Sequence, residues 1–274
     1  MKMSVLQIDP PVHQRMADLE DMIGKGELPG ESLSQSQTEF LTTESFRIFM
    51  AMNLLSTELE KVKRTSFTMP IMQHVRWDKE GVINTSAHLV RHAARFGPIY
   101  MDGTEGQHRS DPFPLGKQQA IWQGMTIWTD ELVRKGVPKD KVHYTGPAYN
   151  TPDEHNEMIK MAIADQWKDV IIIGNSYQML RIALGTIQVM KKNDYWMRCF
   201  FVVPETGDWF VPMKGPQGSD DGPRLNQLWQ EFLRIPEYQQ KGDLCSLNEL
   251  IRYMTYGRDS VENGELTKSI DSEE

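Results

Sequence analysis

The pattern of apolar and polar positions is typical of strands in some segments and of helices in others. Together these segments predict an α/β fold. The stretch 142–190 contains a short strand at 142–145, a helix, an apolar strand at 169–174 and a second helix. Units of this kind form parallel sheets with right-handed crossovers. The run Val170–Ile173 is β-branched without alternation, which is typical of a strand buried on both faces. We therefore expect Ile171 and Ile173 to be almost fully buried at the centre of a sheet.

Other apolar segments complete the prediction. We expect five mostly parallel strands near 67–75, 98–101, 141–145, 169–174 and 197–203. We expect helices over 37–62, 84–96, 117–135, 223–238 and 246–256. The predicted organisation is an N-terminal helical appendage (1–62), an α/β domain (63–204), a C-terminal loop with helices (205–256) and a disordered acidic tail (257–274).

Composition narrows the classes of function. The 274 residues carry a net charge of −8, which argues against binding along a nucleic-acid backbone. The two cysteines, Cys199 and Cys245, fit a reducing compartment. The longest apolar run is far shorter than a membrane span, and the N-terminus lacks the apolar core of a signal peptide. We expect a cytoplasmic protein that does not bind membranes.

Candidate chemistry lies in the turns that follow the predicted strands. The segment D-G-T-E-G at 102–106 places glycines just after a strand, where backbone N–H groups can approach a phosphate; a purely structural turn explains it equally well. The turn Gly174-Asn175-Ser176 leads directly into a helix, and helix N-termini favour anions. The sequence therefore predicts a site where these turns meet.

Two further segments have both a structural and a functional interpretation. Thr151-Pro152-Asp153-Glu154 reads as a capping box with Thr151 as N-cap, while Asn150 and Asp153 are candidates to line a crevice. Arg181 falls in the first two turns of its helix and off the predicted packed face, so an anion should meet it. That anion is either Asp153 or Glu154, or the carboxylate or phosphate of a ligand.

His88 and His92 stand four residues apart on a predicted helix, a spacing that suits a metal pair. No H-E-x-x-H pattern and no third ligand accompanies them in the sequence. We expect both to be solvent-facing and expect no metal.

Short motifs between about 80 and 204 resemble the YdcF/SanA/ElyC family. They are G-V-P-K-D-K-V at 136–142, N-T with an acidic residue behind it at 150–154, V-I-I-I-G-N-S at 170–176, and Y-Q-M-L-R-I-A at 177–183. The D-G-T-E-G loop falls where the family has a glycine-rich loop. The resemblance implies a doubly wound, Rossmann-like sheet of order 3-2-1-4-5. It is closest to the soluble YdcF branch, which is associated with binding S-adenosylmethionine.

The chain departs from the family pattern at three places. Gln178 replaces a usual His, Gly124 or a neighbour replaces a usual Glu, and Asp153-Glu154 replaces Glu-Asn. If those family residues carry chemistry, this chain has altered or lost it. Two functions stay open: a small-molecule-binding protein or enzyme for a nucleotide-like, S-adenosylmethionine-like or phosphorylated ligand, and a non-catalytic interaction protein with a degenerate site.

The predicted site lies at the carboxyl end of the sheet, together with segment 74–77, and would take a small anionic molecule. Its expected ligand-binding residues are Asp102, Gly103, Gly106, Asn150, Thr151, Asp153, Asn175, Ser176, Gln178 and Arg181. No catalytic residue and no metal ligand is predicted. Replacing Arg181 by alanine is expected to abolish ligand binding at little cost in stability.

Overall fold

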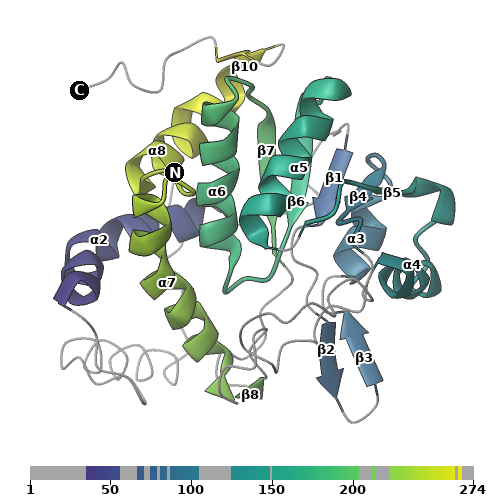
Figure 1. Cartoon of the computed structure of the whole chain (residues 1–274), viewed down its shortest axis with the longest axis horizontal. Coiled ribbons are helices and arrows are strands. Elements are labelled where there is room, and N and C mark those ends of the chain that lie inside the picture. The colour runs from purple at the N-terminus through teal and green to yellow at the C-terminus, as the bar shows by residue number, and fades with distance from the viewer. Residues whose placement is uncertain are drawn as a thin grey trace, which may run out of the picture. The chain divides into compact units, whose positions relative to one another are not determined.

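A computed structural model gives the fold (Figure 1). It describes residues 35–55, 67–70, 75–78, 81–84, 87–104, 125–148, 150–203, 212–213, 222–262 and 265–266. The chain divides into two compact units, Met1–Ser45 and Phe46–Glu274. In the first unit the described residues form the beginning of helix α2 (Gln35–Leu54), and all other described elements belong to the second unit.

Five parallel strands form the central sheet. They are β1 (Phe67–Pro70), β4 (Ile99–Met101), β5 (Val142–Tyr144), β6 (Asp169–Ile173) and β7 (Arg198–Val202). Their spatial order is β5-β4-β1-β6-β7. Strand β6 pairs on both sides, with Ile171 opposite Thr68 of β1 and opposite Phe200 of β7. The β-branched run therefore occupies the interior of the sheet.

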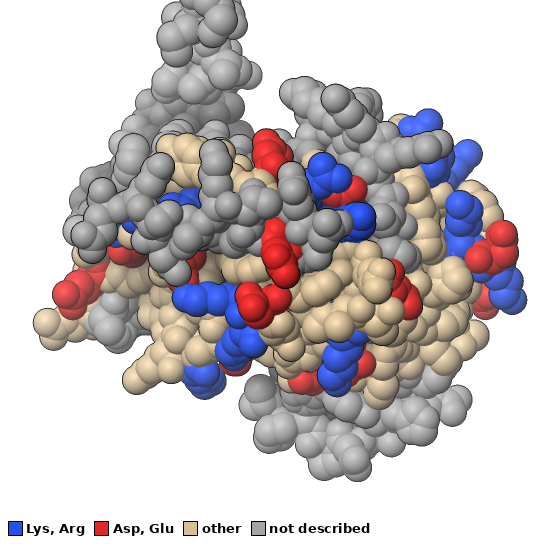
Figure 2. Space-filling model, turned by 90° about the horizontal axis from the view of Figure 1, so that it is seen from above, with Lys and Arg blue, Asp and Glu red and all other residues tan. Residues whose placement is uncertain are grey.

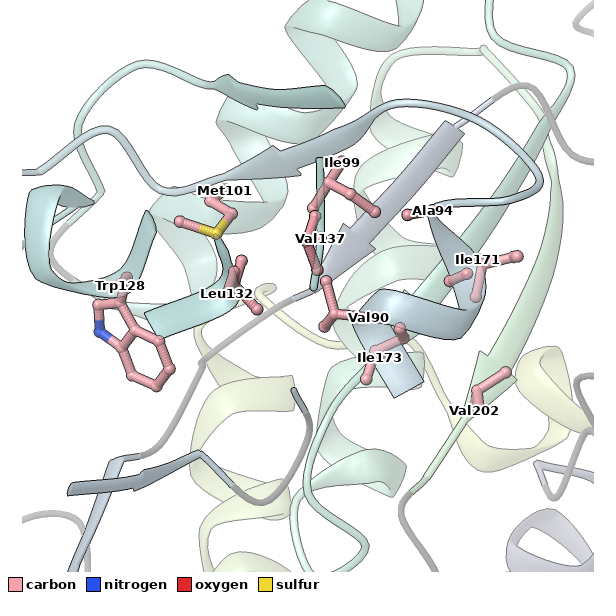
Figure 3. Close-up of a cluster of buried hydrophobic side chains, with 11 residues drawn as sticks. Val90, Ala94, Ile99, Met101, Trp128, Leu132, Val137, Ile171, Ile173 and Val202 are labelled. Atoms are coloured by element: carbon pink, nitrogen blue, oxygen red, sulfur yellow. The ribbon is translucent and has the colours of Figure 1, made fainter. Parts of the chain in front are cut away.

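Helices cover both faces of β6. On one face Ile171 and Ile173 join a cluster with residues of α3 (Ala87–Ala93) and α4 (Met125–Arg134), shown in Figure 3. Side chains alternate along a strand, so Val170 and Ile172 point to the opposite face. All four residues are fully buried, which confirms the expectation for Ile171 and Ile173. Helices α5 (Thr151–Ala164) and α6 (Met179–Lys192) pack against each other beside β6 (Figure 1).

The expected fold class, a doubly wound and mostly parallel five-stranded Rossmann-like sheet, needs correction. The strands are only three to five residues long, and β1 meets β4 at a single registered pair, Thr68 opposite Ile99. The sheet is therefore a three-stranded part and a two-stranded part that join at one pair. We describe the protein as α/β with short parallel strands and not as the Rossmann-like sheet expected.

Part of this correction has a clear physical cause. Strand β1 was expected to reach 75, but it ends at Pro70, which has no N–H to donate to a ladder. Residues 75–78 instead form β2 (Val75–Asp78), which pairs antiparallel with β3 (Gly81–Asn84). Asn84, expected to begin a helix, ends that hairpin. Two more antiparallel pairs were not predicted: β8 (Pro212–Met213) with β9 (Gly222–Pro223), and β10 (Val261–Glu262) with β11 (Glu265–Leu266).

The C-terminal helices complete the second unit. They are α7 (Arg224–Gln240), α8 (Leu247–Arg252), the π-helical turn η5 (Tyr253–Gly257) and the short 3₁₀ turn η6 (Arg258–Ser260). The buried Tyr253 hydroxyl accepts a hydrogen bond from Cys199 N and donates one to Met197 O. A single side chain thereby satisfies one backbone group in the outer strand β7 and one just before it.

Residues 258–262 and 265–266 are described and lie within the segment expected as a disordered acidic tail. The Arg258 guanidinium lies 5.6 Å from the ring centroid of Phe200, and Val261 is buried. A cation–π contact and buried apolar area hold this segment on β7. The expected domain boundaries stay predictions.

Candidate functional site

The loop after β4 is closed onto the loop after β5 by one carboxylate. Asp102 Oδ1 accepts hydrogen bonds from Thr104 N at 2.8 Å, Thr104 Oγ1 at 2.6 Å and Ala148 N at 3.0 Å. The Thr104 hydroxyl also lies 3.0 Å from Ala148 O. Asp102 and Thr104 are both buried. The Asp102 carboxylate therefore organises the carboxyl end of the sheet, and the two loops lie side by side.

Gly103 sits where these loops touch. A Cβ atom built on it would lie 2.3 Å from the backbone oxygen of Thr145, a distance that side chains do not adopt. The reason for glycine here is thus close approach of two backbones, and no phosphate is needed to explain it.

We expect Gly103→Ala to lower the free energy of unfolding by about 1–3 kcal/mol, because the loop must shift away from a backbone atom. Urea unfolding measures it. Gly242→Ala is the control, since nothing lies within 4 Å of its Cβ position and its cost comes from a φ of +77° alone. Wild-type stability in Gly103→Ala would show that the 102–104 loop moves freely.

The N-cap of helix α5 is Asn150, one residue before the expected N-cap Thr151. Asn150 has extended backbone angles, and its Oδ1 accepts a hydrogen bond from Asp153 N at 2.9 Å. The capping box predicted for Thr151 and Glu154 is therefore wrong. An asparagine oxygen does the same job from the preceding position, which leaves the buried Thr151 hydroxyl for another partner.

Removing that cap is expected to cost about 1 kcal/mol in Asn150→Ala. The matched control is Asn156→Ala, an exposed position inside the same helix, where alanine should leave stability unchanged or slightly higher. Thermal unfolding of the two variants compares them directly. Equal melting temperatures would mean that Asn150 does not cap the helix.

Arg181 is buried in an ion pair that joins three helices. Its Nε donates to Glu231 Oε2 of α7, and its Nη1 donates to the Thr151 Oγ1 of α5 at 3.1 Å. Only 7% of the Arg181 side chain and 4% of the Glu231 side chain are exposed. The Tyr238 ring lies 5.7 Å from the guanidinium carbon. The arrangement links the first turns of α5 and α6 to the middle of α7.

Two expectations about Arg181 are corrected by this geometry. Arg181 is not off the packed face, because residues 179–187 of α6 are all buried. Its carboxylate partner is neither Asp153 nor the adjacent Glu154, although Glu154 contributes to the local potential. Burial alone would lower the pKa of Arg181, but the Glu231 carboxylate outweighs it and the pKa is raised. The guanidinium stays charged and is neutralised from within the chain.

His155 lies between α5 and α6 against the backbone of Gly185. A Cβ on Gly185 would lie 2.2 Å from the His155 Cε1 atom, so glycine is what admits the ring. No described residue forms a hydrogen bond with its Nε2 atom. Burial, with a smaller effect of Arg181, lowers the pKa of His155 to about 3 against an opposing backbone hydrogen bond to Ile182. The imidazole is therefore neutral at pH 7.

The turn between β6 and α6 presents uncharged polar groups. Asn175 and Gln178 are buried, and Asn175 Nδ2 donates to Gln178 Oε1 at 3.3 Å. Gln178 N also bonds Asn175 O at 3.0 Å. Ser176 is half-buried, and Asn150 is exposed. Among the described residues, no side-chain hydrogen bond caps α6 at Gln178.

The remaining predictions divide between described and undescribed residues. Gly106, Gly124 and His74 lie outside the described residues, and so does the His88 side chain. Segment 75–77 belongs to the β2–β3 hairpin. His92 is half-buried and contacts Arg95. In the part of the chain that the structure describes, no group of three His, Cys, Asp or Glu side chains could hold a metal ion.

Sequence reasoning missed Glu231, Tyr238 and His155. Glu231 offered one signal: it lies on the same helical stripe as Leu228 and Ile235, where an acidic residue is unexpected. An acidic residue on an apolar stripe implies a buried cation opposite it. Nothing in the sequence indicates that the cation is Arg181, 50 residues earlier.

Comparison with known proteins adds no relative. No family model, no curated protein and no solved structure matches the chain. The likeness to the YdcF/SanA/ElyC family thus rests on the short motifs alone. None of the helices in the described ranges is both long and apolar enough to cross a membrane.

Proposed function

We propose that this chain is a small-molecule-binding protein of the YdcF type, with its ligand at the carboxyl edge of the sheet. The observation that carries the proposal is a chain of contacts at this edge. The Asp102–Thr104 loop bonds Ala148 just ahead of α5, and Arg181, in the first turn of α6, bonds Thr151 at the start of α5. Two helix N-termini and several uncharged polar side chains share this edge. Ligands of open parallel sheets bind in such places.

The charges favour a ligand without net negative charge. Among the described residues near this edge, carboxylates come from Asp102, Asp153, Glu154 and Glu231, and guanidiniums from Arg181 and Arg234. Both guanidiniums already contact Glu231. An S-adenosylmethionine-like ligand, with its cationic sulfonium and uncharged nucleoside, suits this balance better than the phosphorylated or anionic ligand expected from the sequence.

Calorimetric titration with S-adenosylmethionine, adenosine, AMP and a sugar phosphate tests the proposal. S-adenosylmethionine should bind the wild type, and Asn175→Ala should weaken binding at least tenfold. The matched control is Asn193→Ala at the far end of α6, where Asn193 bonds Val189 O at 2.8 Å. The proposal fails if no adenosyl compound binds, or if both asparagine variants bind equally well.

One observation favours the second candidate function, a non-catalytic interaction protein with a degenerate site. Arg181, the residue best suited to ligand recognition, is fully engaged by Glu231 and Thr151. On the face shown in Figure 2, described acidic and basic side chains are interspersed, an arrangement that suits a soluble partner of mixed charge. Wild-type protein that binds no compound of the panel, yet elutes in a complex after co-purification, would favour this function.

We also propose a reducing compartment such as the cytoplasm. Both cysteines are buried and unpaired, and burial raises the pKa of Cys199 to about 12. Cysteines without a disulfide partner are usual in reducing compartments. Localisation of a tagged full-length chain tests this directly.

A further inference from the structure

We propose that Glu231 determines which ligand charge the candidate site accepts. Its carboxylate occupies the position beside Arg181 where an anionic ligand would otherwise bind. This inference rests on the proposed function and names the class of ligand that the site rejects. With Glu231 in place, the edge accepts neutral or cationic molecules; without it, Arg181 becomes a receptor for small anions.

The first support is the position of Arg181. It stands in the first turn of α6, immediately after the Asn175–Gln178 turn, and it donates to the first residue of α5. A guanidinium at two helix N-termini adds its charge to the positive ends of their dipoles. Such a position attracts an oxyanion strongly, and its planar donors match a carboxylate or phosphate.

The second support is that a carboxylate of the chain itself, Glu231, already pairs with Arg181. A carboxylate bonds the Arg181 Nε, and it comes from α7, which follows β6 by some 50 residues. Glu231 is itself held by Arg234 at 3.1 Å, one turn further along α7. The Glu231 carboxylate is therefore fixed in place before any ligand arrives.

The third support is burial. Both partners are more than nine-tenths buried, so the charge of either is costly when the other is removed. A molecule bearing its own anion cannot pair with Arg181 unless it displaces Glu231, which leaves that buried carboxylate with only the half-buried Arg234 as a partner. The wild-type site thus discriminates against phosphorylated ligands, because binding one would separate a buried ion pair.

Chemical rescue of Glu231→Ala tests this inference, with acetate and inorganic phosphate as probes. The substitution removes the carboxylate and leaves space for an anion beside Arg181. We expect each probe at millimolar concentration to raise the melting temperature of Glu231→Ala by several degrees more than that of the wild type. The control is Glu157→Ala, which breaks the more exposed Glu157–Lys160 pair in α5 and should show no added response.

A second variant identifies the anion's partner. In Arg181→Met/Glu231→Ala the added response to acetate and phosphate should disappear, because no buried guanidinium remains. In ligand titrations, the ratio of the affinity for AMP to the affinity for adenosine should be at least tenfold higher in Glu231→Ala than in the wild type.

Two outcomes overturn the inference. One is a Glu231→Ala protein that responds to the probes no more than the wild type does, including one that stays unfolded at every probe concentration. The other is an equal response in the double variant. Neither depends on adenosyl binding by the wild type, so failure of this inference and failure of the proposed function are told apart.

Discussion

Replacing Arg181 by alanine is expected to lower the free energy of unfolding by about 3–5 kcal/mol, because it removes the buried partner of the Glu231 carboxylate and leaves only the half-buried Arg234 beside it. The Thr151 hydroxyl loses its donor in the same step. This is the opposite of what the sequence suggested, since a residue off the packed face would have cost little. Urea unfolding at pH 7, followed by circular dichroism, measures the change.

Two controls separate the buried ion pair from other effects. Arg234→Ala removes the half-buried guanidinium that also contacts Glu231, and we expect a loss of at most about 1 kcal/mol. The double variant Arg181→Met/Glu231→Leu removes both charges and should recover much of the stability, since an apolar pair of similar volume often replaces a buried ion pair without loss. An Arg181→Ala protein as stable as Arg234→Ala would contradict the buried pair.

Acid is expected to destabilise the protein through His155 over the range from pH 6.5 down to about 3. The pKa of this imidazole falls from 6.5 to about 3 on folding, because burial disfavours the charged ring. Above pH 6.5 the ring is neutral in both states and stability does not depend on it. As the pH falls below 6.5 the unfolded chain binds a proton that the folded chain refuses, so the free energy of unfolding decreases.

The expected slope is about 1.4 kcal/mol per pH unit, which reaches roughly 5 kcal/mol by pH 3. Denaturant unfolding at intervals between pH 7 and 4 measures it in the wild type and in His155→Gln, which cannot titrate. The difference between the two slopes isolates this residue from the carboxylates. His143→Gln, at an exposed histidine on β5, is the control.

The prediction has a definite contrary result. If His155→Gln and the wild type lose stability in parallel below pH 6.5, then His155 takes up its proton in the folded state. In that case the imidazole would have solvent or an acceptor at Nε2, and its contact with Gly185 would not exclude water.

Local sequence determined those features whose physical cause is local. The β-branched run Val170–Ile173 predicts a buried strand, and Ile171 and Ile173 are fully buried. Asn150, beside Thr151-Pro152, marks the start of α5 to within one residue, because a capping side chain bonds a backbone N–H only two or three residues further on. The turn after β6 likewise leads straight into α6.

Tertiary structure decided the features that depend on distant parts of the chain. Whether Arg181 faces a ligand, Asp153 or Glu231 depends on where α7 packs, and helical periodicity in α6 carries no information about that. The same holds for Gly103, whose neighbour is the backbone of Thr145, and for His155, whose pKa is set by burial between two helices. The apolar pattern predicted the buried strand β6 but not the burial of Arg181, and only the packed fold decides which charges meet there.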